Sequence, residues 1–238
     1  MTEIATGLIL NRATDAAPLR LADFRFAAFD MDSTLIAIEC IDEIAALAGV
    51  GEQVAAITEA AMRGEITDFR ESLNRRLALL AGQPESLLDR VLRERLRFNP
   101  GARELCAALK AAGLQLGLVS GGFTHFTRFV AAELGMDVVR ANELEVIDGR
   151  LTGRVRQQAW GDVVDGAEKR RFLLQHCELL GCAPAQAIAV GDGANDLPMM
   201  GAAGLSVAFH AKPKVREQAQ VSIETGGLER LLQVFTPV

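Results

Sequence analysis

The chain has 238 residues, of which 50% are apolar, so it can bury one large core that also carries an inserted segment. Its 25 basic and 31 acidic residues give a net charge of −6, which argues against a general nucleic-acid-binding surface. No apolar run is long enough to predict a membrane span, and the first residues lack the pattern of a signal peptide. The cysteines, Cys40, Cys106, Cys177 and Cys182, lack CxxC or zinc-ligand spacing, so we expect reduced thiols in a cytoplasmic protein.

The first part of the chain predicts one buried strand followed by a helical insert. Residues 4–10 could form a short strand, and the apolar run that ends at Asp30 predicts the first buried strand over 24–30. Apolar residues then recur at helical spacing over 38–99, and nothing there is typical of a strand. We therefore expect an all-helical insert over 38–99, with residues 1–37 and 100–238 forming the main domain.

After Asn99-Pro100-Gly101, helices and strands alternate. We expect helices over 102–112, 126–134, 169–180 and 228–234, strands over 114–119, 137–140, 187–190 and 205–208, and loops over 120–122 and 191–196. Asp148-Gly149 lies between apolar residues within 144–155 and predicts a hairpin. Alternating strands and helices predict an α/β fold, a Rossmann-like doubly wound and mostly parallel sheet covered by helices on both faces.

The most informative motif is Asp30-Met31-Asp32-Ser33-Thr34, directly after the first predicted strand. Doubly wound proteins bind ligands at the carboxyl ends of their strands. Two carboxyl groups this close repel each other unless a cation or a shared proton relieves them, and Mg²⁺ binds through one or two carboxylates plus substrate phosphate. The pair therefore predicts a phosphate and metal site, although an Asp/Ser turn that caps the next helix would also explain it.

Three further polar elements lie at predicted strand ends or helix starts. Ser120-Gly121-Gly122 would let the backbone approach an anion, Lys169 would supply a positive charge, and the segment 191–196 adds Asp192 and Asp196. Taken singly, each has an ordinary explanation as a turn, a solvated lysine or a helix cap. If the four elements share one sheet edge, the carboxylates converge on one lysine, and Mg²⁺ can clamp a phosphoryl group there.

The set DxDST, SGG, Lys169 and GDxxND, in this order, resembles the haloacid dehalogenase superfamily of phosphohydrolases. The resemblance covers about residues 24–215. It includes Glu39-Cys40-Ile41-Asp42-Glu43, Ala61-Met62, 69–77, Ala141-Asn142-Glu143-Leu144, 148–153 and Ala211-Lys212-Pro213.

The resemblance implies roles for the residues of the main domain. Asp30 would be the nucleophile that forms an aspartyl-phosphate, and Asp32 would act as acid and then as base. Mg²⁺ would be held by Asp30, Asp192 and the main-chain carbonyl of Asp32, with Asp196 supporting them. Ser120 and the Gly121 amide would bind phosphate oxygens, Lys169 would offset negative charge, and Asn195 would contact the substrate.

The insert resembles a small cap that selects the substrate. The resemblance implies hydrolysis of O-phospho-L-serine, a small phosphorylated amino acid, in the last step of serine synthesis. Glu39 would bind the substrate ammonium and Arg76 its carboxylate, because a guanidinium binds a carboxylate through two parallel hydrogen bonds. The adjacent Arg75 is the competing candidate. Met62 and Phe69 would be apolar lid residues, although ordinary helix core explains them equally well.

Other interpretations stay open. The same chemistry could pass the phosphoryl group to another alcohol such as homoserine, and a phosphoacceptor signalling domain also gathers acidic residues and a lysine at a sheet edge. A monomer and a homodimer are equally compatible with the sequence. We assign no role to His125 or His210, expect His176 on a helix surface, and expect no regulatory domain before the first strand.

Overall fold

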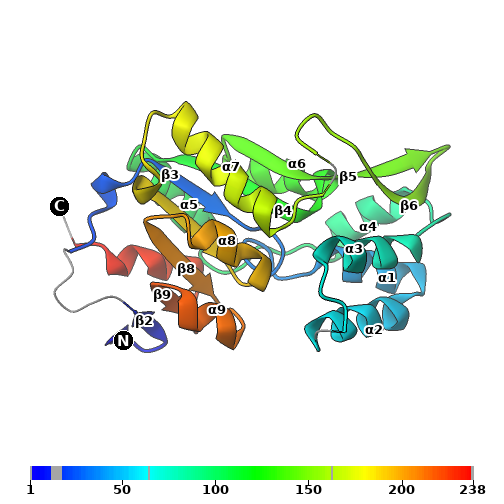
Figure 1. The fold of residues 1–238 in the computed structure, drawn as a ribbon, viewed down its shortest axis with the longest axis horizontal. Coiled ribbons are helices and arrows are strands. Elements are labelled where there is room, and N and C mark those ends of the chain that lie inside the picture. Colours follow the sequence, from blue (N-terminus) through cyan, green and yellow to red (C-terminus); the bar gives the residue numbers. More distant parts are fainter. Residues whose placement is uncertain (1, 12–17, 64, 162, 237–238) are drawn as a thin grey trace.

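The computed structural model describes residues 2–11, 18–63, 65–161 and 163–236. Over these residues the strands form one mixed sheet (Figure 1). In spatial order the strands are β1 (Thr2–Ala5), β2 (Leu8–Leu10), β9 (Val221–Ile223), β8 (Leu205–Phe209), β7 (Ala187–Gly191), β3 (Phe26–Phe29), β4 (Gln115–Phe123), β5 (Val138–Ile147) and β6 (Arg150–Arg156). The predicted α/β class with a mostly parallel sheet is confirmed.

Strand β3 lies at the centre of the parallel part of the sheet. It pairs with β4 and β7, and Phe29 lies opposite Leu118 on one side and Val190 on the other. Parallel strands carry their carboxyl ends to the same edge of a sheet. The residues that follow Phe29, Val190 and the middle of β4 therefore meet at one edge.

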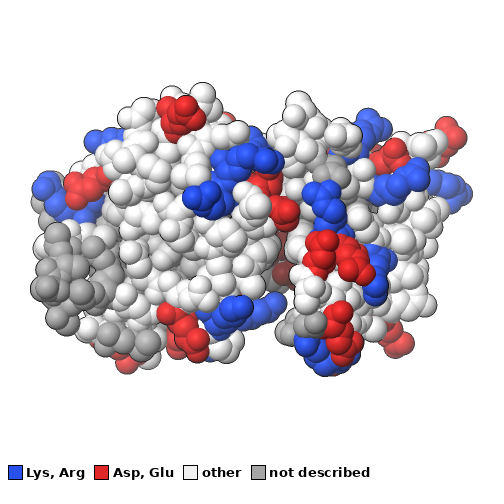
Figure 2. All heavy atoms as spheres, viewed as in Figure 1, with Lys and Arg blue, Asp and Glu red and all other residues white. Residues whose placement is uncertain are grey.

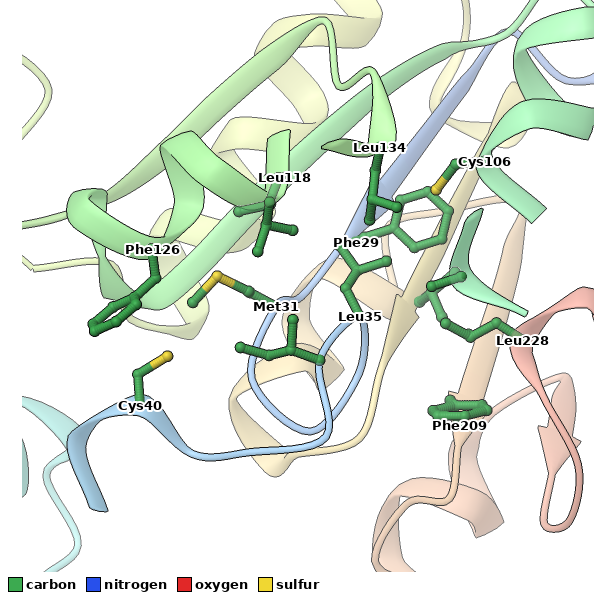
Figure 3. Close-up of a cluster of buried hydrophobic side chains, with 14 of the residues drawn as sticks. Phe29, Met31, Leu35, Cys40, Cys106, Leu118, Phe126, Leu134, Phe209 and Leu228 are labelled. Atoms are coloured by element: carbon green, nitrogen blue, oxygen red, sulfur yellow. The ribbon is translucent and has the colours of Figure 1, made fainter. Parts of the chain in front are cut away.

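The two faces of the sheet bury different side chains of β3, because successive strand residues point to opposite faces. Phe29 belongs to the core layer under α5 (Ala102–Ala111) and α6 (Thr124–Leu134), part of which Figure 3 shows with Leu118 and Phe126. Phe26 belongs to the opposite layer under α7 (Gly166–Leu179) and α8 (Leu197–Met200), where Phe172 packs. Helices cover both faces, as in a doubly wound fold.

Four helices occupy the described part of 38–99, at the right of Figure 1. They are α1 (Cys40–Ala48), α2 (Gly51–Met62), α3 (Phe69–Ala78) and α4 (Ser86–Glu94). Gly49 ends α1 with a φ of 76°, and the Asp68 side chain caps α3 by accepting a hydrogen bond from the Arg70 amide. The helical character predicted for this segment is thus present.

The β5–β6 hairpin also binds the insert. Its turn residues Asp148 and Gly149 have φ values of 51° and 71°, as a tight two-residue hairpin requires. The Gly82 amide donates to the Leu151 carbonyl at 2.8 Å, and the Leu151 amide donates to the Gln83 carbonyl at 2.9 Å. The hairpin, which the sequence assigns to the main domain, therefore anchors the insert.

Several local predictions were wrong. Residues 120–122, expected as a loop, lie within β4, and β5 runs on to Ile147 because it also pairs with β6. Residues 4–10 are not one strand but the end of β1, a turn at 6–7 and β2, and the terminal helix is a 3₁₀ helix, η4 (Leu228–Val234). The sequence did not predict β9 or α9 (Pro213–Gln218). The short 3₁₀ helices are η1 (Leu21–Asp23), η2 (Pro184–Gln186) and η3 (Ala194–Asp196).

The cysteines are free thiols: Cys40, Cys106 and Cys177 are buried and Cys182 is partly buried. His176 was expected on a helix surface but is half-buried, with its ring 4.2 Å from that of Phe172. Among the described residues, no helix is long and apolar enough to cross a membrane.

Candidate active site

Three carboxyl groups meet at the carboxyl edge of the sheet. Asp30 follows β3, Asp192 follows β7, and Asp196 ends η3. Each offers an oxygen atom within 4.8 Å of an oxygen of the other two. The structure thus brings together residues that are about 160 positions apart in the chain, because parallel strands share this edge. In Figure 2 a furrow separates the surface of the sheet and its helices from that of the insert, and both acidic and basic side chains lie along it.

Lys169 lies beneath these carboxylates and has no exposed surface. Its Nζ lies 2.7 Å from Asp30 Oδ1 and 2.6 Å from Asp196 Oδ1. Burial alone would lower the pKa of Lys169, but Asp196 and Asp30 raise it above its ordinary value. The buried ammonium therefore stays charged and compensates part of the negative charge of the site.

Asp196 holds the loop after β7 in place. Its Oδ1 accepts from Lys169, and its Oδ2 accepts from the amides of Asp192 and Gly193 at 3.2 and 3.0 Å. A Cβ at Gly191 would lie 2.4 Å from Asp196 Cγ, so only glycine lets the carboxylate approach this closely. Both oxygens of Asp196 are engaged by protein donors, whereas Asp30 and Asp192 each keep a carboxylate oxygen that could bind a cation.

Burial and repulsion by neighbouring carboxylates raise the pKa of both Asp30 and Asp192. The pKa of Asp30 is raised by burial and by Asp196 and Asp192, against the opposing effect of Lys169. The pKa of Asp192 is raised to about 7 by burial, Asp196 and Glu39. Such a pair of oxygen donors fits a hard cation such as Mg²⁺, which would relieve the repulsion and, when bound, neutralise charge on a phosphoryl group.

Thr34 is a site residue that sequence reasoning missed. Its side chain is fully buried, and its Oγ1 donates to Asp192 Oδ1 over 3.2 Å. It thereby orients one of the two carboxylates that remain for a cation. Its place at the end of the Asp30–Thr34 motif was the available signal.

Asp32 lies beside the same edge, close to the glycine segment of β4. Its Oδ1 accepts from the Cys40 amide at 3.3 Å, and a Cβ at Gly122 would lie 2.7 Å from its Oδ2. Burial, followed by the charge of Glu39, raises the pKa of Asp32 to about 7. A carboxyl group with this pKa is substantially protonated near neutral pH, as a general acid must be.

The Ser120-Gly121-Gly122 segment forms a bulge in β4. The register with β5 passes from Ser120–Ala141 directly to Phe123–Asn142, so Gly121 and Gly122 are extra residues on β4. Ser120 is buried, and its Oγ accepts a hydrogen bond of 2.9 Å from the Gly122 amide. The bulge places Gly122 next to the carboxyl group of Asp32.

The adjacent arginines of α3, Arg75 and Arg76, have different surroundings. Arg76 is partly buried, which lowers its pKa, while Asp42, Glu39 and Asp32 act in the opposite direction. Arg75 is exposed and pairs with Glu71 at 2.5 Å. Of the two adjacent arginines, Arg76 is therefore the one within electrostatic reach of the site.

The remaining predicted site residues have the following positions. Glu39 is exposed, precedes α1 and accepts from Ser33 Oγ at 2.7 Å. Phe69 lies over Gly121, since a Cβ at this glycine would lie 2.9 Å from the ring Cζ. Asn195 is partly exposed, beside Gly193. The side chain of Met62 lies outside the described part of the structure.

His125 and His210 make their contacts outside the cluster of Asp30, Asp192 and Asp196. His125 Nε2 lies 3.2 Å from Asp89 Oδ1 of α4. His210 stacks on Phe209, and its Nε2 lies 2.9 Å from the Gly226 carbonyl oxygen.

Residues 27–201 match the family model of haloacid dehalogenase-like hydrolases. The chain therefore belongs to the haloacid dehalogenase-like hydrolase family. It is 64% identical over 236 residues to a phosphoserine phosphatase of Albidiferax ferrireducens, with 99% of each chain covered. It is 62% identical over 233 residues to a phosphoserine phosphatase of Polaromonas sp., with 98% of each covered.

Solved structures show the same likeness. An unliganded probable phosphoserine phosphatase from Vibrio cholerae superposes with a TM-score of 0.78 at 45% identity, covering 91% of this chain and 65% of that one. A phospho-aspartyl intermediate analogue of phosphoserine phosphatase superposes with a TM-score of 0.82 at 38% identity, covering 90% of this chain and 99% of that one.

Proposed function

We propose that the chain hydrolyses O-phospho-L-serine to L-serine and phosphate, the last step of serine synthesis. The observation that carries this proposal is the placement of Asp30 against buried Lys169 and beside Asp192 at the sheet edge. Relatives named phosphoserine phosphatase that match over nearly the whole chain support the choice of substrate. Free, mostly buried thiols are typical of a reducing compartment, which favours the cytoplasm.

In the proposed reaction, Asp30 is the nucleophile. An oxygen of its carboxylate attacks phosphorus and forms an aspartyl-phosphate while the bond from phosphorus to the serine oxygen breaks. Asp32, protonated in part near neutral pH, gives its proton to the departing serine oxygen. Asp32 then takes a proton from a water molecule that attacks the aspartyl-phosphate, which releases phosphate and restores Asp30.

Other residues of the main domain hold the phosphoryl group and its charge. Ser120 and the Gly121 amide donate to phosphate oxygens, and Lys169 offsets negative charge on Asp30 and on the phosphate. Asp30, Asp192 and the Asp32 carbonyl would hold Mg²⁺, and Asp196 keeps Asp192 and Lys169 in position.

The helical insert, 38–99, acts as a cap on the main domain formed by 1–37 and 100–238. Glu39 binds the substrate ammonium and Arg76 its carboxylate. The supporting observation for Arg76 is its partial burial next to acidic groups of the site. Its Nε donates to the Ser72 carbonyl oxygen at 3.3 Å, and a guanidinium carries further N–H groups that can bind a substrate carboxylate. Phe69, and Met62 with it, exclude water when the cap is closed.

The test is release of phosphate from O-phospho-L-serine with Mg²⁺ and with a chelator. We expect equal amounts of serine and phosphate with Mg²⁺ and none with the chelator. Asp30→Asn should abolish turnover, whereas Asp23→Asn, an exposed site in η1, should leave it unchanged. Full activity in the Asp30→Asn protein would contradict the aspartyl-phosphate step. Formation of phosphohomoserine on addition of homoserine would instead identify a phosphotransferase.

A further inference from the structure

Asn142 of β5 is a fully buried polar side chain that joins two parts of the site. Its Nδ2 donates to the Gly121 carbonyl oxygen at 2.7 Å. Its Oδ1 accepts from the Val164 amide at 2.8 Å. One carboxamide thus bonds the glycine bulge of β4 at one end and the segment before α7 at the other. These two segments are more than 40 residues apart in the chain.

The first bond fixes the peptide group between Gly121 and Gly122. The carbonyl of this peptide accepts from Asn142, and its N–H donates to Ser120 Oγ at 2.9 Å. Because Ser120 Oγ accepts this hydrogen bond, its own proton remains available for a phosphate oxygen. Asn142 therefore sets the orientation of the Ser120 hydroxyl through one intervening peptide.

The second bond fixes the start of α7. Val164 immediately precedes Asp165, whose side chain caps the helix by accepting from the Glu168 amide at 2.8 Å and whose carbonyl accepts from the Lys169 amide at 2.9 Å. Gly121 lies directly against this segment, since a Cβ on it would be 3.3 Å from the Val164 carbonyl oxygen. The position of Lys169 relative to the bulge thus depends on the Asn142 bridge.

We infer that Asn142 is a positioning residue for phosphoryl binding, which holds the Ser120–Gly122 bulge and the Lys169 helix at a fixed separation. The inference rests on the proposed function, because it takes Ser120 and Lys169 as the groups that contact phosphate. An asparagine suits the task because one planar group offers a donor to a carbonyl and an acceptor to an amide. Leucine at this position has nearly the same shape, but it would leave the Gly121 carbonyl and the Val164 amide buried without this hydrogen-bond partner.

Asn142→Ala tests the inference against a matched control, Asn11→Ala. Asn11 also donates to two backbone carbonyls, those of Arg216 and Ala219, but it lies at the β2–β9 end of the sheet. Both variants should melt at a lower temperature than the unchanged protein. Only Asn142→Ala should lower kcat, by about tenfold or more, and weaken inhibition by inorganic phosphate to a similar extent. Unchanged kcat and phosphate inhibition in folded Asn142→Ala would overturn the inference.

Asn142→Asp provides a second test, even if the alanine variant fails to fold. A protonated aspartic acid can donate to the Gly121 carbonyl and accept from the Val164 amide as asparagine does, whereas its carboxylate cannot donate. The ratio of kcat in Asn142→Asp to kcat in the unchanged protein should therefore rise as the pH falls. A ratio that does not change between pH 5 and 8 would contradict the positioning role.

Asn142→Ala and Asn142→Asp should each be assayed with O-phospho-L-serine and with p-nitrophenyl phosphate. The loss of kcat caused by Asn142→Ala should be similar for the two substrates, because Asn142 positions the groups that contact the phosphoryl group and both substrates carry that group. If the unchanged protein cleaves the aryl phosphate but not phosphoserine, the proposed function fails while the Asn142 inference is still tested on the aryl phosphate. A loss confined to phosphoserine would overturn the inference and leave the proposed function intact.

Discussion

The ring of Phe69, on the first turn of α3 in the insert, lies against Gly121 in the bulge of β4. A Cβ built on Gly121 would be 2.9 Å from the ring Cζ, closer than a real side chain tolerates. The insert and the proposed phosphate-binding segment are therefore in direct contact at this point, and the absence of a side chain at 121 permits it.

Gly121→Ala should therefore lower kcat/KM for phosphoserine by about tenfold, or ~1.4 kcal/mol, because the new methyl group displaces the Phe69 ring. Phe69→Ala should lower kcat/KM as well, since water would reach the site. In the Phe69→Ala background the added methyl group has no ring to displace, so Gly121→Ala should cost much less. A double-mutant cycle on kcat/KM measures this coupling. Strictly additive losses would show that the contact has no role in catalysis.

Lys169→Met should remove activity and destabilise the fold. The substitution leaves the carboxylates of Asp30 and Asp196 buried without their cation, and loss of one partner of a buried ion pair costs about 3–5 kcal/mol. Urea unfolding without Mg²⁺ measures the change. Lys214→Met, at an exposed lysine, is the control and should change neither stability nor turnover. Turnover within about twofold of the unchanged enzyme in Lys169→Met would contradict the proposed charge compensation.

Arg76→Ala and Arg75→Ala form a matched pair for substrate recognition. Arg76→Ala should lower kcat/KM for phosphoserine roughly 10- to 100-fold, because a charged hydrogen-bonding partner of the substrate carboxylate is lost. The same variant should have a much smaller effect on p-nitrophenyl phosphate, which has no carboxylate. Arg75→Ala removes only an exposed ion pair with Glu71 and should have little effect on either substrate. Equal losses of Arg76→Ala on both substrates would refute its assignment.

The carboxyl groups of the site make stability of the metal-free protein depend on pH. Burial raises the pKa of Asp32 and Asp192 to about 7, whereas the same groups in an unfolded chain titrate at about 4. Between these values the folded state binds more protons than the unfolded state, so stability falls as the pH rises from about 4 to about 7. In EDTA, the melting temperature should fall across this range.

Addition of Mg²⁺ should counteract this loss, and its effect on the melting temperature should be larger at pH 7.5 than at pH 5, because only ionised carboxylates bind the cation well. Thermal melts at several pH values with EDTA and with Mg²⁺ provide the measurement. In Asp192→Asn the stabilisation by Mg²⁺ should largely disappear. A Mg²⁺ effect that is independent of pH would argue against a site built from these carboxylates.

Much of the fold was predictable from local patterns. The apolar run before Asp30 indicated the central strand, helical periodicity indicated the insert, and Asp148-Gly149 indicated the hairpin turn. The failures lie where an element depends on its neighbours. The segment after Val119 has two glycines and was expected to be a loop, but β5 pairs with it on both sides of the bulge. Strand β9 was missed because it is short and is stabilised by β2 and β8.

The sequence by itself determined which chemical groups are present and on which side of the sheet they lie, because a motif directly after a buried parallel strand can only be at its carboxyl edge. Only the tertiary structure decided which partner each group has. Adjacent Arg75 and Arg76 differ in their surroundings, because α3 exposes Arg75 to solvent and partly buries Arg76 near acidic groups of the site. The bonds from Asn142 to Gly121 and Val164 join segments that no local pattern relates, since such contacts form only when distant parts of the chain pack together.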